Sequence, residues 1–435
     1  MFSRTNNCGE LNKTHIGSNV LLCGWVNSLR THGKIIFIDI RDRYGKTQVI
    51  LDKDDLIDKG NSLSNEDVIS ISGKVSARTK EFINKEIATG EIEVIADKLE
   101  ILSVSEPLPV PIHDREASTE EQRLKYRYLE LRNKTLQDNL LKRHHAAQVV
   151  RNFLSKKDFI EIETPVLMKS TPEGARDYLV PSRVHHGKFY ALPQSPQMYK
   201  QLFMISGLDK YFQIVKCFRD EDLRSDRQPE FTQIDLEMSF VDEPDIRNLV
   251  ENLITTVFKE VNGVKIKKPF PVITYNESIQ RYGTDKPDLR YDMELNDFKE
   301  FSNKSDFKSF KDLDYVSMIS VKDEGVFSRK IIDELDNHAK SLGAKGLAWM
   351  KCKNNALDGG IARFFDSNLQ SDIISHYKLK DNSICFMIGD NSNLALKVLG
   401  SVRTKIAEML NLCDNTIFKP VWIVDFPLFE WDKEE

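Results

Sequence analysis

A charged stretch that lies between two apolar runs limits most strongly how this chain can fold. The apolar runs are Tyr211–Val215 and Ile234–Met238, and the residues between them are rich in arginine and acidic side chains. Two apolar runs around a polar loop predict adjacent antiparallel strands whose hairpin projects charge into a cleft. A solvated hairpin with incidental ion pairs is the alternative.

Arg219 and Phe231 give this hairpin the chemistry of a nucleotide site. A guanidinium group can bind a phosphate and a carboxylate together, and an aromatic face can stack on a base. For Phe231, a core aromatic at the start of a strand is the alternative. The sequence Phe218-Arg219-x-Glu221, followed by Arg227-x-x-x-Phe231, resembles motif 2 of class II aminoacyl-tRNA synthetases. From Cys23 to Pro427 the chain resembles a bacterial-type aspartyl-tRNA synthetase.

The N-terminal part predicts a small β-barrel. Five short β-rich runs alternate with turn residues, which favours the five-stranded OB-fold, a barrel often used on nucleic acids. A fragment of a β-sandwich has similar spacing. The runs are Val20–Val26, Ile35–Ile40, Thr47–Leu51, Val68–Val75 and Ile92–Ala96.

The rest of the chain predicts a multidomain protein. Three prolines between Pro107 and Pro111 indicate a stiff linker, and a helical period over 135–154 leads to Pro165. By resemblance this is motif 1, which builds a homodimer interface, although a surface helix before an ordinary strand fits as well. We expect Val421–Phe426 to be a buried strand that returns to the main sheet. The expected division is an OB-fold anticodon-binding domain at 1–105, a linker at 106–134, an α+β class II catalytic domain with an antiparallel sheet at 135–290, an inserted α+β domain at 291–416, and the start of a returning catalytic segment at 417–435.

The resemblance implies an aspartate-tRNA ligase that uses ATP with Mg²⁺. Arg219 and Glu221 are the implied catalytic residues, and no metal ligand is assigned within the chain. Lys200 is placed to meet the substrate side-chain carboxylate, which favours aspartate over asparagine. Asp235 supports this pocket, although a structural aspartate fits nearly as well. The implied aspartate-binding residues are Glu173, Ser195, Gln197, Lys200, Arg219 and Asp235, and the implied ATP-binding residues are Arg219, Asp220, Glu221, Gln228 and Phe231.

For tRNA, the resemblance implies an anticodon face on the barrel. Phe37 offers a ring for stacking, although a core position is the alternative because isoleucines surround it. His32 stands where relatives that also charge tRNA(Asn) often have histidine, so tRNA(Asn) joins tRNA(Asp) as an expected partner. The implied anticodon residues are Arg30, His32, Phe37, Gln48, Arg78 and Glu93.

Composition excludes several classes of protein. The formal charge of −5 means that nucleic acid must bind at local basic patches. Six cysteines without metal or disulfide spacing, and no apolar run long enough to span a bilayer, predict a soluble cytoplasmic protein. Two other functions stay open: a non-catalytic tRNA-binding relative or inactive fragment, and amino-acid activation for another product. The N-terminal barrel argues against the second.

The family's motif 3, with its late arginine and magnesium-holding acid, does not occur in the sequence up to Glu435. We therefore expect this chain by itself to be weak or inactive in forming aspartyl-adenylate. The measurement is aspartate-dependent exchange between ATP and pyrophosphate. A near-normal exchange rate would contradict the expectation.

Overall fold

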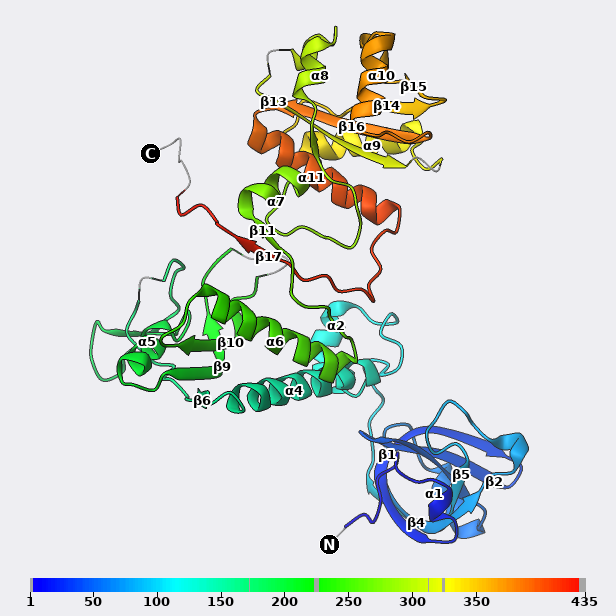
Figure 1. Ribbon diagram of the computed structural model, residues 1–435. Coiled ribbons are helices and arrows are strands. Elements are labelled where there is room, and N and C mark those ends of the chain that lie inside the picture. Colours follow the sequence, from blue (N-terminus) through cyan, green and yellow to red (C-terminus); the bar gives the residue numbers. More distant parts are fainter. Residues whose placement is uncertain (1–2, 172, 223–226, 312, 323–324, 430–435) are drawn as a thin grey trace. The chain divides into compact units, whose positions relative to one another are not determined.

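The computed structural model describes residues 3–171, 173–222, 227–311, 313–322 and 325–429 (Figure 1). It divides into two compact units, Met1–His145 and Ala146–Glu435, with helix α4 (Lys134–Ser155) running across the division. Each unit has its own apolar core. Among the described residues, no helix combines the length and apolarity that a membrane span requires.

The first unit contains a closed five-stranded barrel, as predicted. Alternate residues of each strand fill its core, for example Ile36, Ile38 and Ile40, which are all buried. Helix α1 (Asp54–Asn61) lies between β3 and β4 and adds Leu56 to that core. The strand order is β1-β2-β3-β5-β4, with β1 Asn19–His32, β2 Ile35–Asp42, β3 Gly45–Leu51, β4 Val68–Ala77 and β5 Ile92–Ser103. Short 3-10 turns occupy Lys13–His15 and Lys80–Phe82.

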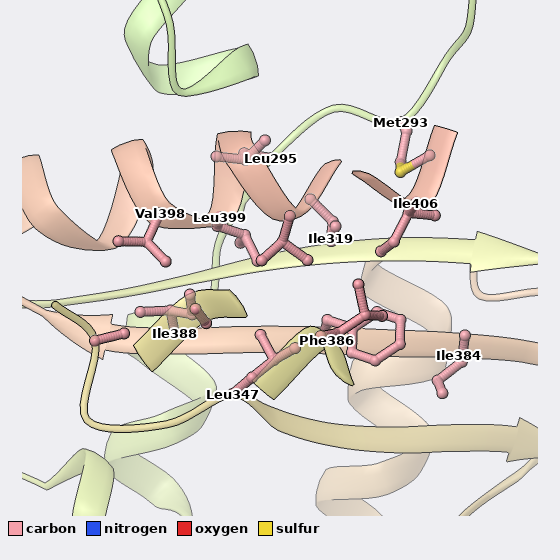
Figure 2. Packing of buried hydrophobic residues seen from close by; sticks show 14 of the residues in the cluster. Met293, Leu295, Ile319, Leu347, Ile384, Phe386, Ile388, Val398, Leu399 and Ile406 are labelled. Atoms are coloured by element: carbon pink, nitrogen blue, oxygen red, sulfur yellow. The ribbon is translucent and has the colours of Figure 1, made fainter. Parts of the chain in front are cut away.

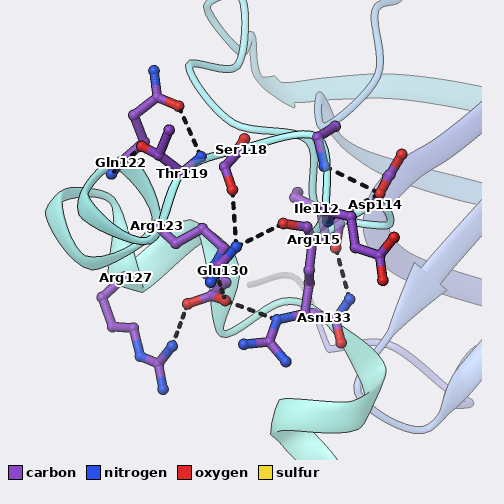
Figure 3. Close-up of polar contacts among 12 residues, drawn as sticks. Ile112, Asp114, Arg115, Ser118, Thr119, Gln122, Arg123, Arg127, Glu130 and Asn133 are labelled. Carbon is purple, nitrogen blue, oxygen red and sulfur yellow. Dashed lines mark hydrogen bonds and ion pairs between the residues drawn. The ribbon is translucent and has the colours of Figure 1, made fainter. Parts of the chain in front are cut away.

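After the barrel, side chains rather than backbone pairing hold the proline-rich segment. Residues 104–119 contain no helix or strand, and two short helices follow, α2 (Glu120–Lys125) and α3 (Arg127–Glu130). The buried carboxylate of Glu130 accepts from Arg115 Nε at 2.9 Å, lies 3.3 Å from Arg123 Nε and also pairs with Arg127 (Figure 3). Asn133 Nδ2 donates to the Ile112 carbonyl at 2.9 Å. These contacts give the segment a defined path despite its lack of regular structure.

The second unit opens with a three-stranded sheet in the order β10-β9-β6. Strands β9 (Lys210–Phe218) and β10 (Glu230–Met238) form the predicted antiparallel pair, and β6 (Ile160–Glu161) runs parallel to β9. The C-terminal half of α4 and helix α6 (Glu243–Asn262) bury Leu154 and Leu253 in one cluster with Phe212 of β9. Asp242 caps α6, and Gly263, with φ of 69°, ends it in the left-handed conformation that glycine adopts without strain. Helix α5 (Gln197–Ile205) and the hairpin of β7 (Leu179–Pro181) and β8 (Phe189–Ala191) complete this part.

A five-stranded sheet forms the α+β portion between about residues 291 and 416. The sheet is buried on both faces: Ile384, Phe386 and Ile388 pack on the side of α9 and α11 (Figure 2), whereas Cys385 and Met387 pack with residues of α8 and α10. The order is β12-β13-β16-β14-β15. The bounds are β12 Asn296–Asp297, α8 Lys299–Lys304, β13 Tyr315–Lys322, α9 Arg329–Ser341, β14 Ala348–Lys353, β15 Ala356–Asp358, α10 Ser367–His376, β16 Ser383–Asp390 and α11 Ser392–Met409, with 3-10 turns at Lys308–Phe310 and Ala362–Phe364.

Arg403 of α11 anchors the chain that leads into this sheet. Its buried guanidinium donates to the backbone carbonyls of Met293 at 2.7 Å and Asp288 at 2.9 Å, and lies 4.2 Å above the ring of Tyr291. Helix α7 (Tyr275–Tyr282) ends at Gly283, where a Cβ would lie 2.1 Å from the carbonyl oxygen of Leu396. Glycine at this position therefore permits close contact between the end of α7 and α11.

The prediction of a buried strand returning to the main sheet is wrong in two respects. Strand β17 (Trp422–Val424) is half-buried, and it pairs in parallel with β11 (Val272–Thr274), in a separate two-stranded sheet. The apolar run suggested full burial because sequence alone does not show which partner covers a strand. The β11–β17 pair joins the segments on either side of the five-stranded sheet.

Candidate functional site

The candidate active site is built on one face of the β9–β10 hairpin. Side chains alternate across a strand, so Phe231, Gln233, Asp235 and Glu237 of β10 share a face. Their partners in the register are residues of β9: Cys217 lies opposite Phe231, and Gln213 lies opposite Asp235. Polar side chains on this half-buried face predict a site rather than a second apolar core.

Lys200 meets this face from helix α5. Its ammonium group donates to Asp235 Oδ1 at 2.9 Å and lies 3.4 Å from Glu237 Oε2. The side chains of Lys200 and Asp235 are only 12% and 9% exposed, so water screens the pair weakly. Burial raises the pKa of Asp235 above its usual value, although the hydrogen bond from Lys200 opposes that rise.

Arg219 and Phe231 face each other across the hairpin. The Arg219 guanidinium carbon lies 5.1 Å from the centre of the Phe231 ring, which is half-buried. The backbone N–H of Arg219 donates to the carbonyl of Pro229 at 3.0 Å. This backbone contact closes the base of the hairpin, and the guanidinium over the ring is a cation–π arrangement.

Glu173 and Ser195 form the third part of the site. Ser195 Oγ donates to Glu173 Oε2 at 2.7 Å, and Thr171 Oγ1 donates to Glu173 Oε1 at 3.0 Å. The loop that carries Glu173 lies against the hairpin, since the backbone N–H of Asp220 donates to the Arg176 carbonyl at 3.1 Å. Gln197 is half-buried at the first position of α5, where its N–H lies 3.3 Å from Ser195 Oγ.

Cys217 of β9 lies on the same face of the hairpin, opposite Phe231. Burial raises the pKa of Cys217 to about 11; the charges of Asp235 and Glu173 raise it further, whereas those of Arg219 and Lys200 lower it. The Cys217 thiol also lies 3.2 Å from Gln233 Oε1, on the face that carries Asp235.

The rest of the hairpin is more exposed. Arg227 Nη1 donates to Glu221 Oε2 at 2.7 Å, and Asp220 and Gln228 are exposed. Pro172, next to Glu173, and residues 223–226 of the hairpin lie outside the described residues. Among the described residues, no group of three or more histidine, cysteine, aspartate or glutamate side chains is placed to hold a metal ion.

A second polar surface lies on the outside of the barrel. Phe37 is half-buried and points away from the core that Ile36 and Ile38 fill, because alternation puts it on the opposite face of β2. Arg30, directly opposite Phe37 in the register, lies 3.5 Å from Asp39 and donates to Gln48 Oε1 at 3.3 Å. An aromatic ring beside an arginine therefore occupies the outer face of β1 and β2.

The hydrogen bonds that begin at Arg30 and Gln48 continue to Glu93 of β5. Gln48 Nε2 donates to Glu93 Oε2 at 3.1 Å, and Arg78 Nε lies 3.9 Å from Glu93. Burial raises the pKa of Glu93, and burial lowers the pKa of Arg78. The buried Nη2 of Arg78 has no hydrogen-bond partner among the described residues. His32 is exposed at the end of β1, paired with Ile35 around a tight turn at Gly33.

Three residues of these sites were missed from the sequence. Gln194 is buried and holds the Glu173 loop through Ala175, accepting from its N–H at 3.1 Å and donating to its carbonyl at 2.9 Å. Glu237 could have been found from its two-residue spacing to Asp235 on one strand face. Asp39 contacts Arg30 and Ser28. It could also have been found from its spacing, because two residues after Phe37 it lies on the same face of the strand.

Replacing Lys200 by methionine should destabilise the protein in a pH-dependent way. The change leaves the carboxyl group of Asp235 buried without its cation, so a cost of about 3 kcal/mol is expected at pH 7.5. The pKa of Asp235 is already raised in the folded state. The destabilisation by buried Asp235 is therefore complete above the pKa of this group in the folded state. It decreases as the pH falls toward the pKa of the group in the unfolded chain, so Lys200→Met costs less stability at pH 5 than at pH 7.5. The measurement is the urea midpoint at both pH values.

Lys216→Met is the matched control. Lys216 pairs with Glu230 where both side chains are more than half exposed, so the expected change is within about 0.5 kcal/mol at either pH. An equal cost of Lys200→Met at pH 5 and pH 7.5 would show that the ionisation of Asp235 is not its source.

Both parts of the chain match known protein families. Residues 119–434 match the family model for class II tRNA synthetases (D, K and N), and residues 20–102 match the OB-fold nucleic acid binding domain. The chain is 47% identical to an aspartate–tRNA(Asp/Asn) ligase of Aquifex aeolicus, with 100% of this chain and 73% of the relative covered. It is 49% identical to the protein of the same name from Treponema denticola, covering 99% and 75%, and 46% identical to an aspartate–tRNA ligase of Bacillus licheniformis, covering 100% and 75%.

A solved structure shares the fold. Asparaginyl-tRNA synthetase from Pyrococcus horikoshii, complexed with asparaginyl-adenylate, aligns with a TM-score of 0.58 at 20% identity and covers 93% of this chain and 97% of that one. The predicted combination of an OB-fold barrel with a class II catalytic fold is confirmed. With the family model matched over most of its length and close relatives aligned throughout, the chain belongs to the class II aminoacyl-tRNA synthetases.

Proposed function

We propose that the protein is an aspartate-tRNA ligase, which activates L-aspartate with ATP and transfers it to the 3′ end of tRNA(Asp) in protein biosynthesis. The observation that carries the proposal is that Lys200 with Asp235, and Arg219 with Phe231, lie on one face of the β9–β10 hairpin, with the loop that carries Glu173 against it. Two cations and two carboxylates at one place suit a substrate that has both charges. The names of the relatives that align along the whole chain support the same activity.

In the first step an oxygen of the aspartate α-carboxylate attacks the α-phosphorus of ATP. A new O–P bond forms as the bond to the leaving pyrophosphate breaks, and negative charge accumulates on the phosphoryl oxygens. Arg219 is suited to this step because its guanidinium can hold the carboxylate and the phosphate together. No general base is needed, since the nucleophile is already ionised. Positioning and charge stabilisation therefore supply the catalysis.

The base and the phosphates have further candidate partners on the hairpin. Phe231, beneath Arg219, offers a face for adenine, and Glu221 offers a carboxylate to its amino group. Asp220 and Gln228 are exposed beside them and complete the proposed ATP site. ATP is expected to carry Mg²⁺, for which this chain's described residues supply no ligand cluster, so no step is assigned to the metal.

Selection of aspartate rests on Lys200. The ammonium group of Lys200 lies in a weakly screened site. There the side-chain carboxylate of the aspartate substrate gains a charge-assisted hydrogen bond that the neutral amide of asparagine cannot match. Glu173, with Ser195, presents a carboxylate to the substrate ammonium group, and Gln197 lies beside Ser195. A cation for the side-chain carboxylate and an anion for the ammonium group suit a dicarboxylic amino acid.

The outer face of the barrel suits the unstacked bases of an anticodon. Phe37 provides a stacking surface, and Arg30, Gln48, Glu93 and Arg78 provide donors and acceptors for base edges. The unpaired Nη2 of buried Arg78 is a donor that a base could satisfy. His32 at the tip of the β1–β2 turn extends this face, and we propose tRNA(Asn) as a second substrate. Six free cysteines agree with a reducing cytoplasm.

Side-by-side charging of tRNA(Asp) and tRNA(Asn) with aspartate by the protein tests the function. We expect both to be charged, and His32→Leu to reduce kcat/KM for tRNA(Asn) at least tenfold while that for tRNA(Asp) changes little. Lys34→Leu, in the same exposed turn, is the control and should affect both tRNAs by one factor. Strict charging of tRNA(Asp) alone would end the proposal for His32. Anticodon-dependent binding with no charging of either tRNA would instead identify a non-catalytic relative.

We also propose that the protein is a homodimer. Large apolar residues are exposed on the segment from β6 to β8, including Ile160 at 46%, Leu167 at 53% and Phe189 at 57%. Exposed apolar groups gathered on one segment indicate an interface. This segment follows the helix that resembles motif 1, which favours a second copy of the chain as the partner.

Replacing Val166 and Leu167 together by aspartate should convert the dimer to monomer in sedimentation velocity. Buried charge at an interface costs several kcal/mol, so a shift of the dissociation constant by more than a hundredfold is expected. Phe82→Asp, at an exposed barrel residue, is the control and should leave the dimer intact. A protein that is monomeric at micromolar concentration would contradict the proposal.

A further inference from the structure

A basic pocket lies at the other end of the barrel from the candidate anticodon turn. It is a hollow of about 570 Å³ lined by the β2–β3 turn, by Trp25 of β1, by residues 86–88 and by the linker with the start of α4. Strand β2 runs from the His32 turn to this hollow, over roughly 25 Å at ~3.3 Å per residue. The basic pocket is therefore a different surface from the one that carries Arg30 and Phe37.

Positive charge exceeds negative charge in this pocket. Five cationic side chains line it, Arg41, Arg43, Lys46, Arg132 and Lys134, against the carboxylates of Asp42 and Glu86. Asp42 is already engaged, since it accepts from Arg4 at 3.1 Å and from the N–H groups of Cys8 and Tyr44. Arg43 and Lys46 have no ion-pair partner among the described residues.

Glu66, beneath the pocket, does not cancel this charge. Its buried carboxylate accepts from both guanidinium nitrogens of Arg41, at 2.7 and 2.8 Å, and from Arg132 at 2.6 Å. Two guanidinium groups thus share one carboxylate. The pKa of His113, which also lines the pocket, is lowered by burial and further by the charges of Arg41 and Lys46. The charges that line the pocket therefore give it an excess of cations.

Planar groups are arranged within the same pocket. The Arg132 guanidinium lies 5.3 Å from the centre of a ring of Trp25, and that of Arg43 lies 4.8 Å from the ring of Tyr44, which is half exposed. Guanidinium planes and aromatic rings are the groups on which nucleic-acid bases stack. The pocket therefore combines cations that can bind a phosphate with planar groups on which a base can stack, and its size suits a small ligand.

We propose that the basic pocket binds a nucleotide, with its phosphate on Arg43 and Lys46 and its base against the Tyr44 and Trp25 side of the hollow. The nucleotide is either one residue of a bound RNA outside the anticodon or a free mononucleotide, because the two present the same phosphate and ring. The site is separate from the adenylation residues and from the anticodon face. It does not depend on which amino acid the protein activates.

Equilibrium binding to the full chain, with cytidine monophosphate, hexacytidylate RNA and inorganic phosphate as probes, tests the proposal. The Arg43→Glu/Lys46→Glu variant should weaken binding at least tenfold. Lys74→Glu/Lys98→Glu, on exposed lysines of the same barrel that do not line the pocket, makes the same charge change and should weaken binding less than twofold. Lys46→Met, a milder change, should give an intermediate loss if the charge-reversed variant unfolds.

Hydrogen exchange provides the local readout. Bound nucleotide should slow exchange in peptides that cover residues 41–46, and the slowing should be lost in the pocket variant. Slower exchange with cytidine monophosphate that is lost in the pocket variant identifies a free-nucleotide site. Slower exchange with hexacytidylate but not with cytidine monophosphate identifies an RNA site. Equal weakening by both double variants, or slower exchange outside residues 41–46 only, would overturn the proposal, as would binding of inorganic phosphate as tight as that of either nucleotide.

Discussion

The antiparallel pairing of β9 and β10 is the constraint on which the candidate active site depends. Because side chains alternate along a strand, nine consecutive residue pairs in one register fix which groups face the site. A shift of one residue would move Asp235 and Phe231 to the other face and bring Ile234 and Thr232 in their place. The pairing thus sets the position of Lys200 as well, since its buried ammonium group finds its carboxylates only on that face.

Much of this arrangement could be predicted from the sequence because the informative signals are local. The barrel strands carry a period of two, α4 carries a helical period, and the hairpin residues occur at fixed short spacings. Fold and family therefore followed from patterns that need no knowledge of distant contacts. The side of β2 that carries Phe37 was not decided in this way, because isoleucines occupy both faces of the strand. The register with Arg30 and the burial of Ile36 and Ile38 place Phe37 outside.

What the sequence did not provide are the contacts between distant segments. Gln194 holds the Glu173 loop through backbone groups, and no local pattern predicts that contact with a distant segment. The partner of β17 was wrong for a related reason, since a short apolar run fits many sheet edges. Arg403, a buried cation whose described hydrogen bonds go to carbonyls and a tyrosine hydroxyl, also looks like a surface arginine in the sequence. The roles of Gln194 and Arg403 depend on contacts with segments that are distant in the sequence.

The barrel presents its cations in two different ways, and the difference has physical consequences. On the proposed anticodon face Arg30 lies beside Asp39 and Arg78 lies near Glu93, so we expect a small net attraction for a polyanion and recognition by directed hydrogen bonds. In the basic pocket Arg43 and Lys46 are not balanced, so attraction is strong, depends on salt and is indifferent to base identity. A chain with a formal charge of −5 can hold a polyanion only where cations are locally in excess. Selectivity and attraction are therefore expected at opposite ends of one barrel.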